Sequence, residues 1–171
     1  MTGDSKERYG GVSRLFHWGM GALIAWQMLK FFDRIDDGEH WVGQTLVSWH
    51  VAIGTLLLLI VARIAWANSQ KNNRPGQNPA TATLVWIGHF LMYAAMLLPI
   101  TGVLYLVGNG YGWSAFGMQL IAEGPEIPWM ISVGSLHSPI AWLLLVMVVG
   151  HIGVALQHHF VRRDGVLQRM V

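Results

Sequence analysis

Four stretches of the chain are apolar enough and long enough to cross a lipid bilayer, and polar segments separate them. A helical span needs about 20 mostly apolar residues, because the hydrocarbon core is about 30 Å thick. Proline and glycine inside such spans are tolerated when neighbouring helices satisfy the freed backbone groups. The sequence therefore predicts an all-α fold, a four-helix transmembrane bundle forming a single domain over residues 1–171, with spans at roughly 15–32, 45–66, 84–107 and 129–157.

The composition agrees with a membrane protein. Only 12% of the residues are charged, whereas soluble domains carry about 25%. The chain has no cysteine, which excludes disulfides, thiolate ligands, iron–sulfur clusters and covalently attached c-type haem. The first 14 residues are polar and a long apolar run follows them, so we expect no cleavable signal peptide. We also expect no nucleic-acid partner.

Lysine and arginine are distributed unevenly between the two ends of the predicted bundle. Lys30 and Arg34 fall on one side, and all the others fall on the opposite side: Lys6, Arg8, Arg14, Arg63, Lys71, Arg74, Arg162, Arg163 and Arg169. Because cytoplasmic loops carry an excess of basic residues, this distribution predicts that both termini are cytoplasmic. The outer side instead collects acidic residues: Asp33, Asp36, Asp37, Glu39, Glu123 and Glu126.

Four of the eight histidines lie inside the apolar stretches: His17, His50, His137 and His151. An imidazole in hydrocarbon is costly and marks a functional site by default. His137 and His151 share one span and lie 14 residues apart. In a helix that spacing is roughly 21 Å along the axis and about 40° short of four full turns. The two imidazoles are therefore expected on one helix face at two depths.

The predicted topology pairs the four histidines by depth. His17 and His151 fall at the inner level, and His50 and His137 fall at the outer level. Zinc usually needs four ligands, or three and a water, but each level offers two imidazoles and no carboxylate. Haem supplies four equatorial nitrogens itself and needs only axial ligands. We therefore expect two b-type haems bridging helices of the bundle; the alternative is that each histidine only forms hydrogen bonds between helices.

Small residues accompany the four histidines, as a flat macrocycle close to the helices would require. Gly21 and Gly54 follow His17 and His50 by four residues, and Gly134 and Gly150 lie close to the other two. Small residues are equally common at plain helix–helix contacts in membranes.

Short motifs along nearly the whole chain resemble the bacterial cytochrome b561 family, four-helix dihaem membrane cytochromes that include the superoxide oxidase of the inner membrane. They are Ser13-Arg14-Leu15-Phe16-His17-Trp18, Trp49-His50-Val51, Ile87-Gly88-His89, Leu98-Pro99-Ile100-Thr101-Gly102, Gly112-Trp113-Ser114-Ala115-Phe116-Gly117, Leu136-His137, His151, His158-His159-Phe160 and Asp164-Gly165-Val166-Leu167-Gln168-Arg169-Met170.

The resemblance implies a multi-pass protein of the bacterial inner membrane that binds two haems b through bis-histidine iron ligation. The implied ligand pairs are His17 with His151 and His50 with His137, as the depth argument also gives. It further implies ubiquinone reduction near the cytoplasmic haem. The candidates at that surface are Arg14, His89, His158 and the Arg162–Arg163 pair, since a quinone needs hydrogen-bond donors and a proton supply and histidine titrates in the useful range.

Alternatives exist for some of these residues. His158 and His159 would also suit a polar interfacial cap on the last span. Arg14 would also suit a partner for a haem propionate or a lipid headgroup.

Three functions remain open from the sequence. The first is an oxidoreductase that oxidises superoxide at the outer haem and reduces quinone inside. The acidic outer loops depart from the positive surface that would concentrate a small anion. The second is a non-catalytic electron conduit serving a periplasmic redox partner, for which an acidic face suits a basic protein. The third is a small helical transporter without haem.

Overall fold

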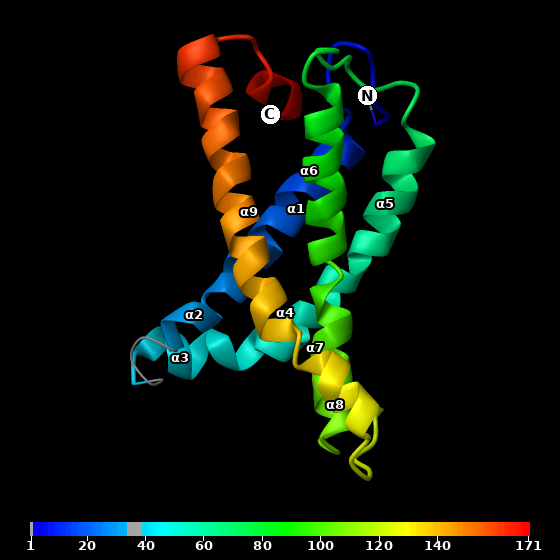
Figure 1. The fold of residues 1–171 in the computed structure, drawn as a ribbon, viewed down its shortest axis with the longest axis vertical. Helices are drawn as coiled ribbons and strands as arrows, with labels where there is room; N and C mark the ends of the chain where they lie inside the picture. The colour runs from blue at the N-terminus through cyan, green and yellow to red at the C-terminus, as the bar shows by residue number, and fades with distance from the viewer. Residues whose placement is uncertain (1, 34–38) are drawn as a thin grey trace.

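The computed structural model describes residues 2–33 and 39–171. Its elements are almost all helical, and both ends of the chain lie at the same end of the molecule (Figure 1). Arg34, Asp36 and Asp37, which were counted among the outer charges, lie outside the described residues.

The first predicted span is realised as two helices, α1 (Gly11–Met28) and α2 (Lys30–Asp33). α1 begins four residues before the predicted start at 15, directly after the extended residue Gly10. Met20 and Ile24 are its buried residues, and a spacing of four puts them on one helix face. They join a core that also contains Leu57, Ile60, Ala95, Met96 and Leu144.

The second apolar stretch forms one helical run of 29 residues from Trp41 to Ser69. Two short 3₁₀ turns interrupt it, and the tighter 3₁₀ geometry marks places where a helix bends. Figure 1 shows α3 and α4 running across the lower part of the molecule and α5 rising from them. In order the elements are α3 (Trp41–Thr45), η1 (Val47–Trp49), α4 (His50–Leu56), η2 (Leu57–Leu59) and α5 (Ile60–Ser69).

The third and fourth stretches are each divided as well. A proline follows the first residue of α7, and proline is tolerated in the first turn of a helix because its missing N–H has no partner there. The elements are α6 (Ala82–Ala95), α7 (Leu98–Gly108), α8 (Pro128–Gly134), α9 (His137–Gln157), a π-helical turn η3 (His158–Arg162) and a 3₁₀ turn η4 (Leu167–Met170).

A β-hairpin, which the sequence analysis did not predict, lies between α7 and α8. Its antiparallel strands are β1 (Trp113–Ala115) and β2 (Met118–Ile121). The two loop residues between them, Phe116 and Gly117, have φ of 52° and 76°. Positive φ at both positions is typical of the two-residue turn that matches strand twist. The Trp113 indole donates to the Thr55 hydroxyl at 3.3 Å, so the hairpin is docked on α4.

Three helical segments are long and apolar enough to cross a membrane: Trp41–Ser69, Ala82–Gly108 and Pro128–Arg162. They contain the second, third and fourth predicted spans. α1 is not among them, although it packs against α4 and α5. A fourth span therefore stays a prediction.

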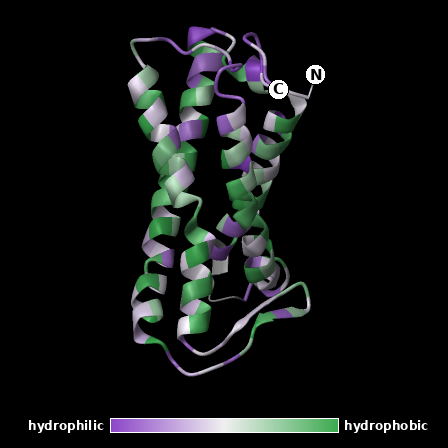
Figure 2. Ribbon diagram, turned by 90° about the vertical axis from the view of Figure 1, so that its right-hand side faces the viewer, coloured by the Kyte–Doolittle hydropathy of each residue, from purple (hydrophilic) through white to green (hydrophobic). Residues whose placement is uncertain are grey.

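The outward surface of the bundle is apolar. On α9, Val146 and Val149 are 66% and 61% exposed. A helix that is hydrophobic all round needs an apolar environment such as lipid. Figure 2 shows the hydrophilic residues gathered at the end where both chain termini lie.

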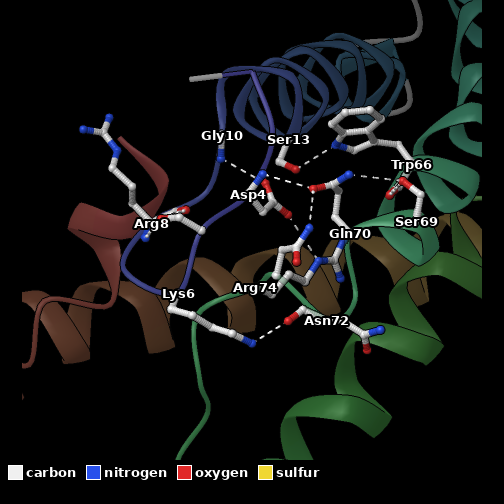
Figure 3. A network of polar contacts seen from close by, with 12 residues as sticks. Asp4, Lys6, Arg8, Gly10, Ser13, Trp66, Ser69, Gln70, Asn72 and Arg74 are labelled. Carbon is white, nitrogen blue, oxygen red and sulfur yellow. Dashed lines mark hydrogen bonds and ion pairs between the residues drawn. The ribbon is translucent and has the colours of Figure 1, made fainter.

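Polar contacts tie the N-terminal segment to the connection between α5 and α6 (Figure 3). The Asp4 carboxylate accepts from the Gly10 N–H at 2.9 Å and pairs with the Arg74 guanidinium at 3.5 Å. The Trp66 indole donates to the Ser13 hydroxyl at 2.9 Å. These contacts anchor the start of α1.

The last residues of the chain return to α1. Arg14 Nη1 donates to the Val171 carbonyl at 2.8 Å, and the Trp18 indole donates to the Met170 carbonyl at 3.0 Å. The structure thus joins the two ends of the chain, and their cytoplasmic placement stays a prediction.

Candidate functional site

The first pair of histidines lies near the hairpin end of the molecule. His50 is the first residue of α4 and His137 is the first residue of α9. Their ring centroids are 6.0 Å apart and the ring planes lie at 80°. Both helices begin directly after a local break in a longer helical run, and these breaks place the two imidazoles opposite each other.

The ring of His137 is oriented by neutral groups of α7. Its Nδ1 lies 3.2 Å from the Leu98 carbonyl oxygen and 3.3 Å from the Thr101 hydroxyl oxygen. An Nδ1–H that donates to a carbonyl leaves the lone pair of Nε2 available for a metal, which is the usual arrangement around metal-bound histidine. The tautomer is inferred from this partner.

Gly102 gives the His137 imidazole its space. A Cβ added at Gly102 would lie 3.0 Å from Cε1 of that ring. The sequence analysis quoted Leu98, Thr101 and Gly102 only as part of a motif and assigned them no role. The signal that could have indicated their role is the hydroxyl of Thr101 and the adjacent Gly102, one turn after the start of α7.

The second group of histidines lies towards the end of the molecule that holds both chain termini. His17 of α1 and His151 of α9 have ring centroids 6.1 Å apart, with planes at 55°. His89 of α6 lies at the same 6.1 Å from His151, with planes at 78°. His17 and His151 are half-buried, whereas His89 is exposed. The structure therefore brings the expected pair together and adds a third imidazole beside it.

An arginine that sequence reasoning treated only as a basic residue of the inner side reaches this group. Arg63 of α5 lies with Nη2 3.5 Å from Nδ1 of His17, and Nη1 donates to the Phe16 carbonyl at 3.3 Å. Its guanidinium carbon lies 5.4 Å from the centre of the Tyr93 ring. No carboxylate forms an ion pair with Arg63 in the part of the chain that the structure describes.

The other residues expected at the inner surface have different partners. His158 Nδ1 contacts Asp164 Oδ2 at 2.5 Å, and this hydrogen bond holds the pKa of the exposed Asp164 carboxyl below its usual range. Arg14 is bonded to Val171, and Arg163 Nε donates to the Phe160 carbonyl at 3.4 Å. Of the quinone-site candidates, only His89 contacts the inner histidine pair among the described residues.

The spacing of both pairs fits a bis-imidazole metal centre. A metal–imidazole nitrogen bond is ~2.0 Å and the ring centre lies ~1.1 Å behind that nitrogen, so two rings on opposite sides of one metal have centroids ~6.2 Å apart. The measured distances are 6.0 and 6.1 Å. The residues present therefore fit a haem with two axial histidines.

The four glycines near the histidines divide into two groups. A Cβ added at Gly21 or Gly150 would meet no atom within 4 Å, which leaves room for a macrocycle. The space at Gly54 is filled by the Gln27 amide, and Gly134 lies against the backbone of Tyr105. Gly54 and Gly134 therefore serve contacts within the protein rather than the approach of a cofactor.

Comparison with known proteins agrees with this geometry. The model of the family described as prokaryotic cytochrome b561 matches residues 8–171. The chain is 30% identical to cytochrome b561 homolog 2 of Escherichia coli (strain K12), over 98% of this chain and 93% of that protein. It is also 30% identical to a protein named probable superoxide oxidase CybB in Yersinia pestis, over 96% of each chain.

A family match over almost the entire chain, together with paired imidazoles on apolar helices, settles the assignment. The chain belongs to the prokaryotic cytochrome b561 family, whose members are haem-containing membrane proteins that carry electrons across the bilayer.

Proposed function

We propose that this cytochrome holds two haems b, one between His50 and His137 and the other between His17 and His151. The observation that carries the proposal is the pair of ~6 Å ring spacings, which are those of two imidazoles on one metal. Both pairs draw one imidazole from α9, whose residues 137 and 151 are separated by roughly 21 Å of helix. That arrangement supports electron transfer between two levels of one bundle.

The protein's own groups prepare each site. Leu98 and Thr101 fix the His137 ring, and Gly102 keeps that ring from being displaced. All four paired histidines are half-buried on apolar helices, which limits the contact of their rings with water. When bound, each haem would supply a metal that accepts and releases one electron. His89, beside His151, is an alternative inner ligand by distance alone, and the greater burial of His17 favours His17.

The orientation that we propose is a single domain with four spans in the bacterial inner membrane and with both termini in the cytoplasm. It is supported by the excess of basic residues at the end where the termini meet. α1 would be the fourth span, since it lies between the other helices and carries His17.

We further propose that the protein oxidises superoxide at the outer haem and reduces ubiquinone at the inner surface. Two superoxide anions would each lose one electron and leave as dioxygen, and the two electrons with two protons would reduce one quinone to the quinol. The relative named as a probable superoxide oxidase supports the donor. A surface hollow of about 530 Å³ is lined by Trp49, Val51 and Ser114 among others, and two of these residues are chain neighbours of His50. His89 and His158 are the proposed proton-bearing groups for quinone.

The second candidate is an electron conduit for a basic redox protein. The exposed acids Glu39, Glu123 and Glu126 favour it, because they give the outer loops a negative surface. An assay in which superoxide is supplied to the purified protein together with a quinone analogue distinguishes the two candidate functions, enzyme and conduit. If the protein is the enzyme, it should reduce the quinone when superoxide is supplied, at a rate that depends on salt because superoxide is charged. Slow haem reduction that does not respond to salt would leave only the conduit.

The dihaem assignment has a direct test. A pyridine haemochrome assay should give two haems b per chain. His50→Ala should remove one haem and His17→Ala the other, whereas His89→Ala should retain both. Loss of the inner haem in His89→Ala with retention in His17→Ala would reverse the inner ligand assignment. A wild-type protein without haem would contradict the proposal.

A further inference from the structure

We propose that Arg63 raises the reduction potential of the inner haem and so makes electron transfer from the outer to the inner haem favourable. This inference rests on the dihaem function proposed above. It concerns a charged side chain in a part-buried position beside one of the two histidine pairs.

The Arg63 guanidinium has three close neighbours, of which the Phe16 carbonyl accepts a hydrogen bond from it. Its guanidinium donates to the Phe16 carbonyl at 3.3 Å, lies 3.5 Å from Nδ1 of His17, and lies 5.4 Å from the centre of the Tyr93 ring. An arginine inside a membrane segment is costly and requires such partners. The Phe16 carbonyl and the Tyr93 ring are neutral, and no ion pair to Arg63 is present among the described residues. Within residues 2–33 and 39–171, therefore, no carboxylate pairs with the positive charge beside His17.

A fixed cation favours the reduced form of a neighbouring haem. A b-type haem with two neutral imidazoles gains one positive charge on the iron when it is oxidised. Charge and hydrogen bonding around the ligands set haem potentials, and an arginine side chain stays protonated at all working pH values. Repulsion between Arg63 and the oxidised iron is relieved by reduction, and it acts in a part-buried site where solvent screening is weak.

The outer pair has a different electrostatic environment. His137 faces the Leu98 carbonyl and the Thr101 hydroxyl, both uncharged. Lys30, the first residue of α2, is exposed, so water and salt screen its charge. The less screened cation therefore lies at the inner level. The resulting difference in reduction potential between the two haems favours electron transfer inward.

A spectroelectrochemical titration of the purified dihaem protein tests the inference. The variants are Arg63→Gln, which removes the charge, Arg63→Lys, which keeps it, and Arg162→Gln, which removes an exposed basic residue of the same side. The titration is repeated in the His50→Ala background, where only the inner haem remains and its potential is assigned directly.

Arg63→Gln should lower the equilibrium constant for reduction of the inner haem about tenfold, which is ~59 mV for one electron. Arg63→Lys and Arg162→Gln should leave it within about threefold of the wild-type value, and the outer haem should not change in any of them. An unchanged inner potential in Arg63→Gln, or an equal shift of both haems, overturns the inference while leaving the dihaem assignment intact.

A second variant covers the case in which Arg63→Gln no longer retains the inner haem. Tyr93→Leu keeps the arginine but removes the ring that holds it beside His17. The inner potential should then fall by a smaller factor in the same direction, and the absence of any fall overturns the inference. A wild-type protein that holds no inner haem would instead contradict the function on which the inference rests.

Discussion

At the scale of single residues, the environment of His137 shows how a proposed haem ligand is held by groups that carry no charge. Leu98 contributes a backbone carbonyl and Thr101 a hydroxyl, and Gly102 contributes only space. The sequence predicted the four paired histidines, because a polar ring in a long apolar run stands out. It could not predict that the Leu98 carbonyl contacts His137 or that Arg63 reaches His17, since these contacts depend on how α7 and α5 approach other helices.

Gly102 provides a prediction at this scale. Gly102→Ala puts a methyl group 3.0 Å from the His137 ring, so the ring must move by a few tenths of an ångström and its bond to Leu98 must lengthen. We expect weaker binding of the outer haem by about tenfold, as for loss of other groups that orient metal ligands, with the inner haem retained. Haem content after dilution into haem-free buffer measures the effect.

Gly88→Ala is the matched control for that experiment. Gly88 also lies inside a helix, and a Cβ there would meet nothing within 4 Å. Equal haem loss in both variants would show that the effect comes from the helix and not from the contact with His137.

At the scale of elements, hydropathy predicted where the apolar helices lie but not where they break. Hydropathy averaged over about 20 residues does not reveal the turns at 57–59, 96–97 and 135–136, because each involves the backbone of only a few residues. The breaks before His50 and His137 are consequential, because each makes a histidine the first residue of a new helix. The hairpin escaped prediction for the same reason, since its strands have only three and four residues.

The turn of that hairpin provides a second prediction. Gly117 has φ of 76°, and a side chain with a Cβ in this left-handed region costs roughly 1–2 kcal/mol. Gly117→Val should therefore loosen the hairpin and weaken the Trp113–Thr55 contact that docks it on α4. Faster amide hydrogen exchange over residues 113–121 measures this change.

Gly124→Val serves as the control, because Gly124 lies in open space and is not among the positive-φ glycines of the described chain. Faster exchange of the hairpin in this variant as well, or no change in Gly117→Val, would contradict the role given to the turn.

At the scale of the whole molecule, the sequence predicted both termini on the same, cytoplasmic side of the membrane. The structure puts the two ends in contact through Arg14, Trp18 and the last residues, and their cytoplasmic placement stays a prediction. The charge distribution predicted it because an even number of crossings returns the chain to its starting side. The particular bonds were beyond prediction, since they connect residues more than 150 positions apart.

The orientation of the bundle can be measured with thiol chemistry, because the chain has no cysteine. A single Glu123→Cys should react with a membrane-impermeant thiol reagent on intact cells, since it is exposed on the proposed outer side. A single Lys71→Cys should react only after the cells are opened. The reverse pattern would place both termini outside, and labelling of both positions in intact cells would contradict a bundle with four crossings.

The double use of α9 has a consequence for the order of biosynthesis. α9 carries both His137 and His151 and is the last long helix to leave the ribosome. Until it has entered the membrane, neither His17 nor His50 has its paired histidine, because both paired histidines lie on α9. A nascent chain that lacks α9 therefore cannot close either histidine pair. In the proposed dihaem protein, the insertion of one late helix would complete both centres at the same step of synthesis.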